Sequence, residues 1–468
     1  MAPNPRIVLV QTFHPYTQFT HVHPLGIMCV AAGARAAGFS DLHLLDMKVE
    51  MLSVEDAAKR LEGLRPDVVG LSAMTYEAGC LHALASEVKK RIPGTLVVAG
   101  GPHPSVAADE VLKDPNVDYV VRGEGDFIFP DLLRSHFGGA DLSEITGISW
   151  RRPDGSVAHN PDRPPPPNLD ELPFPAWDLV PMERYFTVPR GGVIYWHKEF
   201  ATLFSSRACP WRCTYCHNSY GKVFRERSAR NVLAEIDMLV SRYGVKELVF
   251  MDDIFNFKPE RAKGICRGLI ARGYGLKLTF PNGLRGDLLD EELIGLMRRA
   301  GMYRTSIAIE SAVPRLQKFM KKNLNLARCG ENVRRLVDAG VLTHGFFMLG
   351  FPTETREEMV ETIRWARRSP FHTAAFFRVI PFKGTTLYEQ VREAGHALPT
   401  DWSQYEPYFS NINLSEVPER EIARLRRRAY FSFYLSPARM WRFAKRLPNK
   451  RRLVPTLSLL FARRAYAR

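Results

Sequence analysis

The spacing of apolar positions divides the chain into two regions in which strand-like and helix-like segments alternate. In the first region, the short apolar runs that we predict as buried strands are Ile7–Gln11, Asp67–Ser72, Thr95–Ala99 and Asp118–Val121. Stretches with helical spacing, such as Leu25–Gly38 and Leu81–Arg91, lie between them. This alternation is typical of βαβ units around a parallel sheet. It predicts an α/β, doubly wound (Rossmann-like) domain over residues 1–145, with a ligand at the carboxyl ends of the strands.

Prolines interrupt this pattern after the first region. Pro164–Pro167 and Leu172–Trp177 cannot continue a helix or a central strand, so residues 146–195 are predicted to form a proline-rich linker. Six further strands are then predicted, at Thr202–Ser206, Glu247–Met251, Lys277–Pro281, Thr305–Glu310, Gly345–Leu349 and Ala375–Ile380. Helical patterns such as Ala229–Tyr243, Glu291–Ala300 and Arg356–Arg367 separate them. Six βα repeats predict a partial (β/α)6 barrel over residues 196–395, with chemistry at the carboxyl ends of its strands.

Composition narrows the class of protein further. The 468 residues are 45% hydrophobic and 25% charged, which suits two or three globular domains. No apolar stretch approaches the roughly 20 residues that span a bilayer, and the run Ile7–Val10 is too short for a signal peptide, so we expect a cytoplasmic protein. Four of the seven cysteines are scattered and three are clustered. Such a set favours a metal site in a reducing compartment over a disulfide framework.

The positive charge is concentrated at one end of the chain. Residues 420–468 carry fifteen Lys and Arg side chains against Glu421 alone, so almost all of the net charge of +15 lies there. The remaining chain is nearly neutral, and we expect no nucleic-acid partner. Residues 396–468 are predicted to form a basic helical tail. Apolar segments such as Tyr430–Leu435 and Leu457–Phe461 interleave with its arginines, which leaves open peripheral membrane contact or a solvated helical cap on the barrel.

Three cysteines carry the clearest chemical signal. Cys209, Cys213 and Cys216 follow the first predicted barrel strand at C-x3-C-x2-C spacing. Three thiolates on one loop can hold three irons of a [4Fe-4S] cubane and leave the fourth iron open for chemistry. A structural zinc ion is the alternative, but zinc requires four ligands, and His217, adjacent to Cys216, would strain to supply the fourth.

This cysteine loop resembles that of the radical S-adenosylmethionine (SAM) superfamily. The resemblance implies that SAM binds the open iron and is cleaved to a 5′-deoxyadenosyl radical, with an external one-electron reductant. Tyr215 matches the aromatic residue that the family packs near the adenine, although ordinary core packing also explains it. The other strand ends that match SAM-binding positions of the family carry Asp252, Asp253, Arg285, Glu310, Ser311 and Gly350. Each of these, taken singly, is equally well explained as a turn or helix-capping residue.

The first domain, followed by the barrel, resembles the cobalamin-binding subclass of radical SAM enzymes. The residues that carry this resemblance lie at four predicted strand ends and are Pro24, Gly26, Ser72, Thr75, Gly100, Gly101, His103, Gly123 and Glu124. They are the expected cobalamin contacts, because glycines admit a bulky planar ligand and hydroxyls can bond its polar arms. A flavodoxin-like domain without cobalamin remains the alternative.

One departure from cobalamin-binding patterns concerns His23. Proteins that bind cobalamin through a lower-axial histidine carry D-x-H-x-x-G after the first strand, whereas this chain has His21 in place of the aspartate. Without that carboxylate nothing fixes the tautomer of the imidazole. We therefore expect no histidine on the lower face of cobalamin.

The resemblance implies a cobalamin-dependent radical SAM enzyme that methylates an unactivated carbon through a 5′-deoxyadenosyl radical and methylcobalamin. An oxidative cyclase or a rearrangement enzyme for a tetrapyrrole or lipid-like small molecule is the alternative on the same scaffold. A non-catalytic cobalamin sensor is a further alternative, but a sensor has no need for an open iron. Candidates to line the substrate site are Tyr185, Trp196, Arg378 and Lys383, each of which is equally well explained as a structural residue.

Overall fold

The computed structural model describes residues 4–13, 21–188, 194–217, 219–407, 410 and 412–449. It divides into two compact units. The first comprises residues 1–191 with the short segments 219–221 and 401–403, and the second comprises the remainder.

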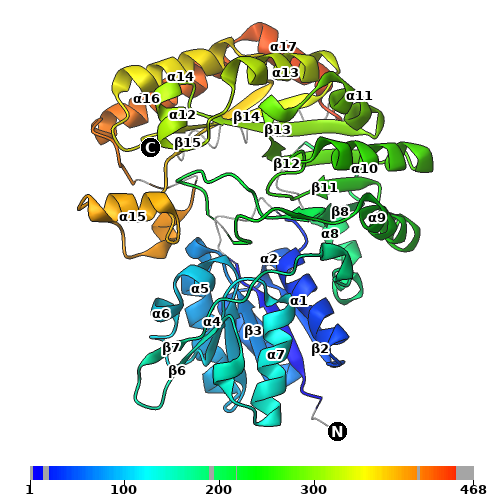
Figure 1. Ribbon diagram of the computed structural model, residues 1–468, viewed down its shortest axis with the longest axis vertical. Coiled ribbons are helices and arrows are strands. Elements are labelled where there is room, and N and C mark those ends of the chain that lie inside the picture. Colours follow the sequence, from blue (N-terminus) through cyan, green and yellow to red (C-terminus); the bar gives the residue numbers. More distant parts are fainter. Residues whose placement is uncertain are drawn as a thin grey trace. The chain divides into compact units, whose positions relative to one another are not determined.

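A seven-stranded sheet forms the centre of the first unit (Figure 1). Its strands are β1 (Ile7–Gln11), β2 (Leu42–Asp46), β3 (Val68–Ser72), β4 (Leu96–Gly100), β5 (Tyr119–Val121), β6 (Ile148–Arg151) and β7 (Val157–His159). The strand order is β2-β1-β3-β4-β5-β6-β7, and β1 to β5 are parallel. The order reverses direction at β1, which is the doubly wound arrangement that the sequence predicted.

Helices cover both faces of this sheet. On one face, α1 (Leu25–Ala36) and α7 (Gly125–Gly138) enclose a core that includes Ile7 and Leu9. On the other face, α3 (Val54–Leu64) and α4 (Ala78–Arg91) enclose a core that includes Val8 and Val10. Alternate residues of β1 thus enter different cores, which explains why the strand is apolar throughout. The short helices of this unit are α2 (Met47–Glu50), α5 (Pro102–Val106), α6 (Ala108–Val111) and α8 (Met182–Thr187).

The predicted linker over residues 146–195 differs from the structure. Its first part forms β6 and β7, which join the sheet in antiparallel orientation beside β5. Its later part includes α8, and Trp177 and Tyr185 are buried. The first unit therefore extends beyond residue 145, because an antiparallel pair needs only a short turn and prolines do not prevent short strands from adding to an edge.

The second unit is a partial parallel barrel of six strands in sequence order. Its strands are β8 (Phe200–Leu203), β11 (Glu247–Phe250), β12 (Lys277–Leu284), β13 (Met302–Glu310), β14 (Leu342–Leu349) and β15 (Thr373–Arg378). The helices are α9 (Ala229–Tyr243), α10 (Pro259–Arg272), α11 (Glu291–Arg299), α12 (Pro314–Phe319), α13 (Leu326–Asp338), α14 (Arg356–Arg368) and α15 (Thr386–Glu393). Figure 1 shows α9, α10, α11, α13 and α14 along the outer side of the sheet. The predicted (β/α)6 arrangement is confirmed, and the short pair β9 (Ser206–Arg207) and β10 (Arg225–Glu226) flanks the loop that follows β8.

Two helices of the basic tail pack on the barrel. α16 (Glu419–Tyr434) contacts β15 and α14, and α17 (Pro437–Arg446) follows it. Arg426 and Arg439 are buried, so part of the basic charge serves packing here. The predicted apolar segment Leu457–Phe461 lies outside the described residues. No helix in the described part of the chain is long and apolar enough to cross a membrane.

Candidate functional site

The cysteine loop lies at the carboxyl end of β8. Ala208, with a φ of +68°, turns the chain into it, and the amide of Cys216 donates to the carbonyl of Cys213 at 3.2 Å. Thr214 fixes the middle of the loop, because its amide donates to the carbonyl of Met320 at 3.0 Å and its carbonyl accepts from Leu387 at 2.8 Å. Hydrogen bonds to two other parts of the barrel therefore hold the loop in place.

The donor set fits an iron–sulfur cluster. Cys209, Cys213 and Cys216 are all free thiols. Desolvation raises the pKa of each, that of Cys216 to about 12, so thiolates at these positions require a positive partner such as iron. Among the described residues, no three potential ligands converge on a single ion. A cubane does not require such convergence, because each thiolate binds a different iron.

Tyr215 and Glu310 form a hydrogen-bonded group beside the loop. Glu310 ends β13 with a φ of +64°, where the register against β14 shifts. Its Oε1 accepts from Tyr215 Oη at 3.1 Å and from Lys322 Nζ at 3.1 Å, and Lys322 Nζ also donates to Tyr215 Oη at 3.2 Å. Desolvation and the nearby carboxylate raise the pKa of Tyr215, so its hydroxyl remains protonated and donates. The ring of Tyr215 also meets Phe351 edge-on at 5.9 Å.

Arg285 is engaged within the protein. Its Nε donates to Asp287 at 3.0 Å, and its Nη2 donates to the carbonyls of Lys322 at 3.0 Å and Asn323 at 3.2 Å. The guanidinium lies 4.2 Å from the centre of the Trp211 ring. Asn282–Leu284, which we expected to follow the third barrel strand, belongs to β12 after a register shift. Arg285 thus links the cysteine loop to the turn that carries Lys322.

The two aspartates after β11 have different surroundings. Asp252 is 2% exposed, and its carboxylate accepts from the amide and hydroxyl of Ser205 and from the hydroxyl of Ser206. Asp253 accepts a hydrogen bond from the amide of Ala208, next to Cys209. Desolvation and the Asp252 carboxylate raise the pKa of Asp253 to about 6. Asp253 therefore faces the cysteine loop, and Asp252 supports the loop from within the protein.

A similar division occurs after β13 and β14. Ser311 is fully buried, and its hydroxyl bonds to Thr362 and accepts from the amide of Val313. Gly350 adopts a φ of +98°, and within the part of the chain that the structure describes no heavy atom lies within 4 Å of the position that a Cβ would occupy. The carboxylate of Glu354 accepts from the Gly350 amide and holds this turn. Gly350 thus presents open backbone, whereas Ser311 contacts protein only.

The predicted cobalamin contacts share one edge of the first unit. They lie on the loops after β1, β3, β4 and β5, which are neighbours in the sheet. At Gly26 and Gly123 no heavy atom of the described residues lies within 4 Å of a Cβ position, so a ligand can approach the backbone there. At Gly101 a Cβ would lie 2.8 Å from Ser72 Oγ, so the fold itself requires this glycine. The remaining members are the α1 N-cap residue Pro24, the α7 N-cap residue Glu124, the buried Thr75 and His103, and the half-buried Gly100. The open backbone at Gly26 and Gly123 leaves room for a ligand at this edge.

His23 is enclosed by aromatic side chains of the same unit. It stacks on Tyr185 with ring centres 4.3 Å apart, and the ring of Trp177 lies edge-on at 5.2 Å. Tyr185 in turn donates a hydrogen bond to Asp46. Aromatic contacts therefore surround the His23 ring within the first unit.

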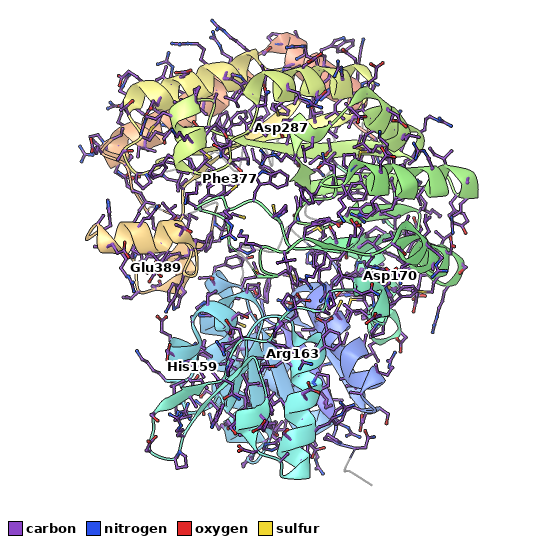
Figure 2. All side chains as sticks on the ribbon, viewed as in Figure 1. His159, Arg163, Asp170, Asp287, Phe377 and Glu389 are labelled. Atoms are coloured by element: carbon purple, nitrogen blue, oxygen red, sulfur yellow. The ribbon has the colours of Figure 1, made fainter. Side chains whose placement is uncertain are left out.

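Three residues expected to line a substrate site make contacts within the protein. Arg378 is buried and bonds Glu419 on α16. Tyr185 bonds Asp46 in the first unit. Trp196 lies 5.1 Å from the Lys277 ammonium, at the start of β12 and so at the opposite end of the strands from the cysteine loop. Lys383 follows β15. In Figure 2, Phe377 lies on the side of β15 away from α14 and α16, the side that faces the barrel interior.

Family models match both units. A B12-binding domain model matches residues 19–133, and a radical SAM superfamily model matches residues 203–366. The predicted fold class, a B12-binding domain followed by a radical SAM barrel, is confirmed.

Individual relatives extend over most of the chain. An uncharacterised methyltransferase of Pyrococcus horikoshii is 32% identical over 88% of each chain. Cytidylyl-2-hydroxyethylphosphonate methyltransferase of Streptomyces wedmorensis is 30% identical over 81% of this chain and 79% of its own. Anaerobic magnesium-protoporphyrin IX monomethyl ester cyclases are also similar, at 23–28% identity. The chain therefore belongs to the family of B12-binding radical SAM enzymes.

A solved structure shares the fold. The radical SAM methyltransferase TsrM of Kitasatospora setae, solved with cobalamin and a [4Fe-4S] cluster, superposes with a TM-score of 0.68 at 18% identity. The match covers 83% of this chain and 75% of TsrM.

Proposed function

We propose that this protein is a cobalamin-dependent radical SAM methyltransferase that methylates an unactivated carbon of a small molecule. The observation that carries the proposal is the loop of three free thiols at the carboxyl end of β8, in a chain that also has a B12-binding domain. When bound, the cluster and SAM supply a 5′-deoxyadenosyl radical and cobalamin carries a methyl group. Methylation is favoured over cyclisation because relatives at 32% and 30% identity are named methyltransferases.

The residues of the barrel bind and orient these groups. Cys209, Cys213 and Cys216 ligate three irons. Tyr215 and Glu310 form one wall of the SAM site, because both present hydrogen-bonding groups beside the cysteine loop. The open backbone at Gly350 and the carboxylate of Asp253 complete the site. Asp252 and Ser311 hold the neighbouring backbone in place through their hydrogen bonds within the protein.

The residues of the first unit bind cobalamin. Gly26 and Gly123 admit the ring, since no described atom lies within 4 Å of the position that a Cβ would occupy at either residue. Ser72, Thr75 and His103 offer polar groups from neighbouring strand ends.

Product mass tests the proposal. The protein is reconstituted anaerobically with cluster and cobalamin. It is then supplied with a one-electron reductant and with SAM that carries a deuterated methyl group, and it is incubated with candidate small-molecule substrates. A methyltransferase yields 5′-deoxyadenosine together with a product that carries the labelled methyl group. 5′-Deoxyadenosine with an unlabelled product would indicate a cyclase or rearrangement enzyme. If neither 5′-deoxyadenosine nor any product were formed, the result would contradict an enzymatic role.

The proposal also covers the location of the enzyme and the source of its electrons. We infer a cytoplasmic protein that receives electrons from an external reductant. The basic tail contacts an anionic membrane surface peripherally, because cations and large apolar residues alternate in it.

A further inference from the structure

The turn between α16 and α17 exposes three large apolar side chains to solvent. Phe431, Leu435 and Trp441 are 46%, 69% and 63% exposed, respectively. Phe431 and Leu435 are four residues apart, so they share one face at the end of α16, and Trp441 follows on α17. Exposed apolar residues that are gathered in one place and rimmed by polar groups are typical of an interaction surface.

Cations flank these apolar residues on both helices. Arg427 and Arg428 precede Phe431 by four and three residues, so they lie on its face of α16. On α17, the Lys445 ammonium lies 4.9 Å from the centre of the Trp441 ring. The exposed cations that surround the apolar residues on the two helices are Arg427, Arg428, Arg442, Lys445 and Arg446.

The end of α14 adds positive charge beside α17. The guanidinium of Arg439, which is 3% exposed, donates to the carbonyls of Arg367 and Ser369 at 2.7 and 2.9 Å and so ties α17 to this end of α14. The side chains of Arg367 and Arg368 are exposed there. No acidic residue follows Glu421 in the sequence, so α17 and the second half of α16 carry no negative charge. The surface therefore has an apolar centre within a positive rim.

Contacts with the barrel place this surface at the amino ends of the strands. Tyr434, at the end of α16, bonds Ala374 near the start of β15. Phe443 of α17 packs with Leu342, the first residue of β14. Figure 1 shows both helices on the outer side of the barrel. The cysteine loop follows the carboxyl end of β8, so changes to this surface leave the cluster site untouched.

We propose that the surface formed by Phe431, Leu435, Trp441 and the surrounding cations docks on an anionic lipid bilayer. This inference rests on the proposed membrane contact of the basic tail and assigns that contact to particular folded residues. Tryptophan suits the boundary between head groups and acyl chains, because its ring is apolar and its N–H group is polar. Arginine and lysine side chains reach from such a boundary to the lipid phosphates.

Vesicle binding by the full-length protein tests the docking surface. Sedimentation is measured with vesicles of phosphatidylcholine alone and of phosphatidylcholine mixed with phosphatidylglycerol. The wild-type protein should bind the mixed vesicles in a salt-sensitive way and should not bind the neutral ones. Leu435→Ser/Trp441→Ser keeps every charge and should weaken binding by about 10- to 100-fold, because two large side chains no longer enter an apolar environment.

Two further variants separate the contributions. Arg428→Gln/Arg442→Gln removes one cation from each helix and should weaken binding to the mixed vesicles by about 10- to 30-fold. Tyr274→Ser is the matched control, because Tyr274 is an aromatic residue 42% exposed in the turn after α10, and it should leave vesicle binding unchanged. Circular dichroism and the melting temperature show that each variant is folded.

Four outcomes would overturn the proposal. The first is failure of the wild-type protein to bind anionic vesicles, and the second is equal binding by Leu435→Ser/Trp441→Ser. The third is a wild-type dimer that this variant dissociates while it still binds vesicles, which would assign the surface to a second copy of the chain. The fourth is binding of single-stranded RNA that this variant weakens more than vesicle binding. Absence of 5′-deoxyadenosine formation would contradict the proposed enzymatic function and leave the vesicle comparison unaffected.

Discussion

Tyr434→Phe should destabilise the barrel, because the Tyr434 hydroxyl forms hydrogen bonds with backbone groups on the outer edge of β15. β15 is the last strand of the sheet, so the backbone groups of Ala374 point away from β14. Tyr434 Oη accepts from the Ala374 amide at 3.0 Å and donates to the Ala374 carbonyl at 2.8 Å. Tyr430 does the same for the next outward residue, accepting from the Phe376 amide at 3.1 Å. Two tyrosines of α16 therefore take the place of a neighbouring strand.

The size of the effect follows from these contacts. Phenylalanine keeps the buried ring but leaves two backbone groups without a partner, each costing about 1–3 kcal/mol when water is excluded. Some rearrangement reduces the total, and we expect about 2–3 kcal/mol for Tyr434→Phe. For a unit of this size the loss corresponds to a fall of about 4–12 °C in the melting temperature of the barrel. Tyr430→Phe removes one hydrogen bond at a half-buried position and should cost about 1 kcal/mol.

Scanning calorimetry at a fixed scan rate measures both variants against the wild-type protein, since unfolding of a protein of this size is seldom reversible. Circular dichroism of the native state shows whether α16 is retained. A Tyr434→Phe variant that melts within about 1 °C of the wild-type protein, or above Tyr430→Phe, would refute the edge-pairing argument.

Three further predictions concern the first unit and the tail. Burial raises the pKa of Glu77 from 4.5 to about 7, so the unfolded chain loses this proton at lower pH than the folded protein does, and the free energy of unfolding should fall as the pH rises from about 4.5 to 7. Urea titrations should show that the free energy of unfolding depends less on pH in Glu77→Gln than in the wild-type protein. An equal pH dependence in the two proteins would contradict this. Bound cob(II)alamin should show no nitrogen splitting by electron paramagnetic resonance, because His23 packs between aromatic rings; splitting that vanishes in His23→Ala would make it the axial ligand. Removing residues 450–468, which carry six Lys and Arg, should reduce salt-sensitive sedimentation with anionic liposomes, and equal sedimentation of both proteins would rule out membrane contact through this segment.

The sequence predicted the elements whose patterns are local. α9 begins and ends at the predicted residues, Ala229 and Tyr243, because a serine N-cap and a C-terminal glycine bound an amphipathic run. β6 and β7 were missed, since such short strands between polar and proline-rich segments give no clear alternation.

The candidate site shows why individual roles are harder to predict. Adjacent residues at a strand end point in different directions, so only one of Asp252 and Asp253 faces the cysteine loop, and Glu310 and Ser311 divide in the same way. In the sequence the members of each pair look alike. No sequence pattern marked Lys322 as a residue of the site, because tertiary contacts bring its turn to the cysteine loop.

The central claim is that the three thiols hold the cluster that cleaves SAM. The most direct measurement compares the wild-type protein with a variant in which Cys209, Cys213 and Cys216 are all replaced by alanine, both reconstituted anaerobically. The variant should lose the broad iron–sulfur absorbance and all 5′-deoxyadenosine formation, yet bind cobalamin as the wild-type protein does, because cobalamin is held by the other domain. A variant that kept the cluster and still cleaved SAM would contradict the account.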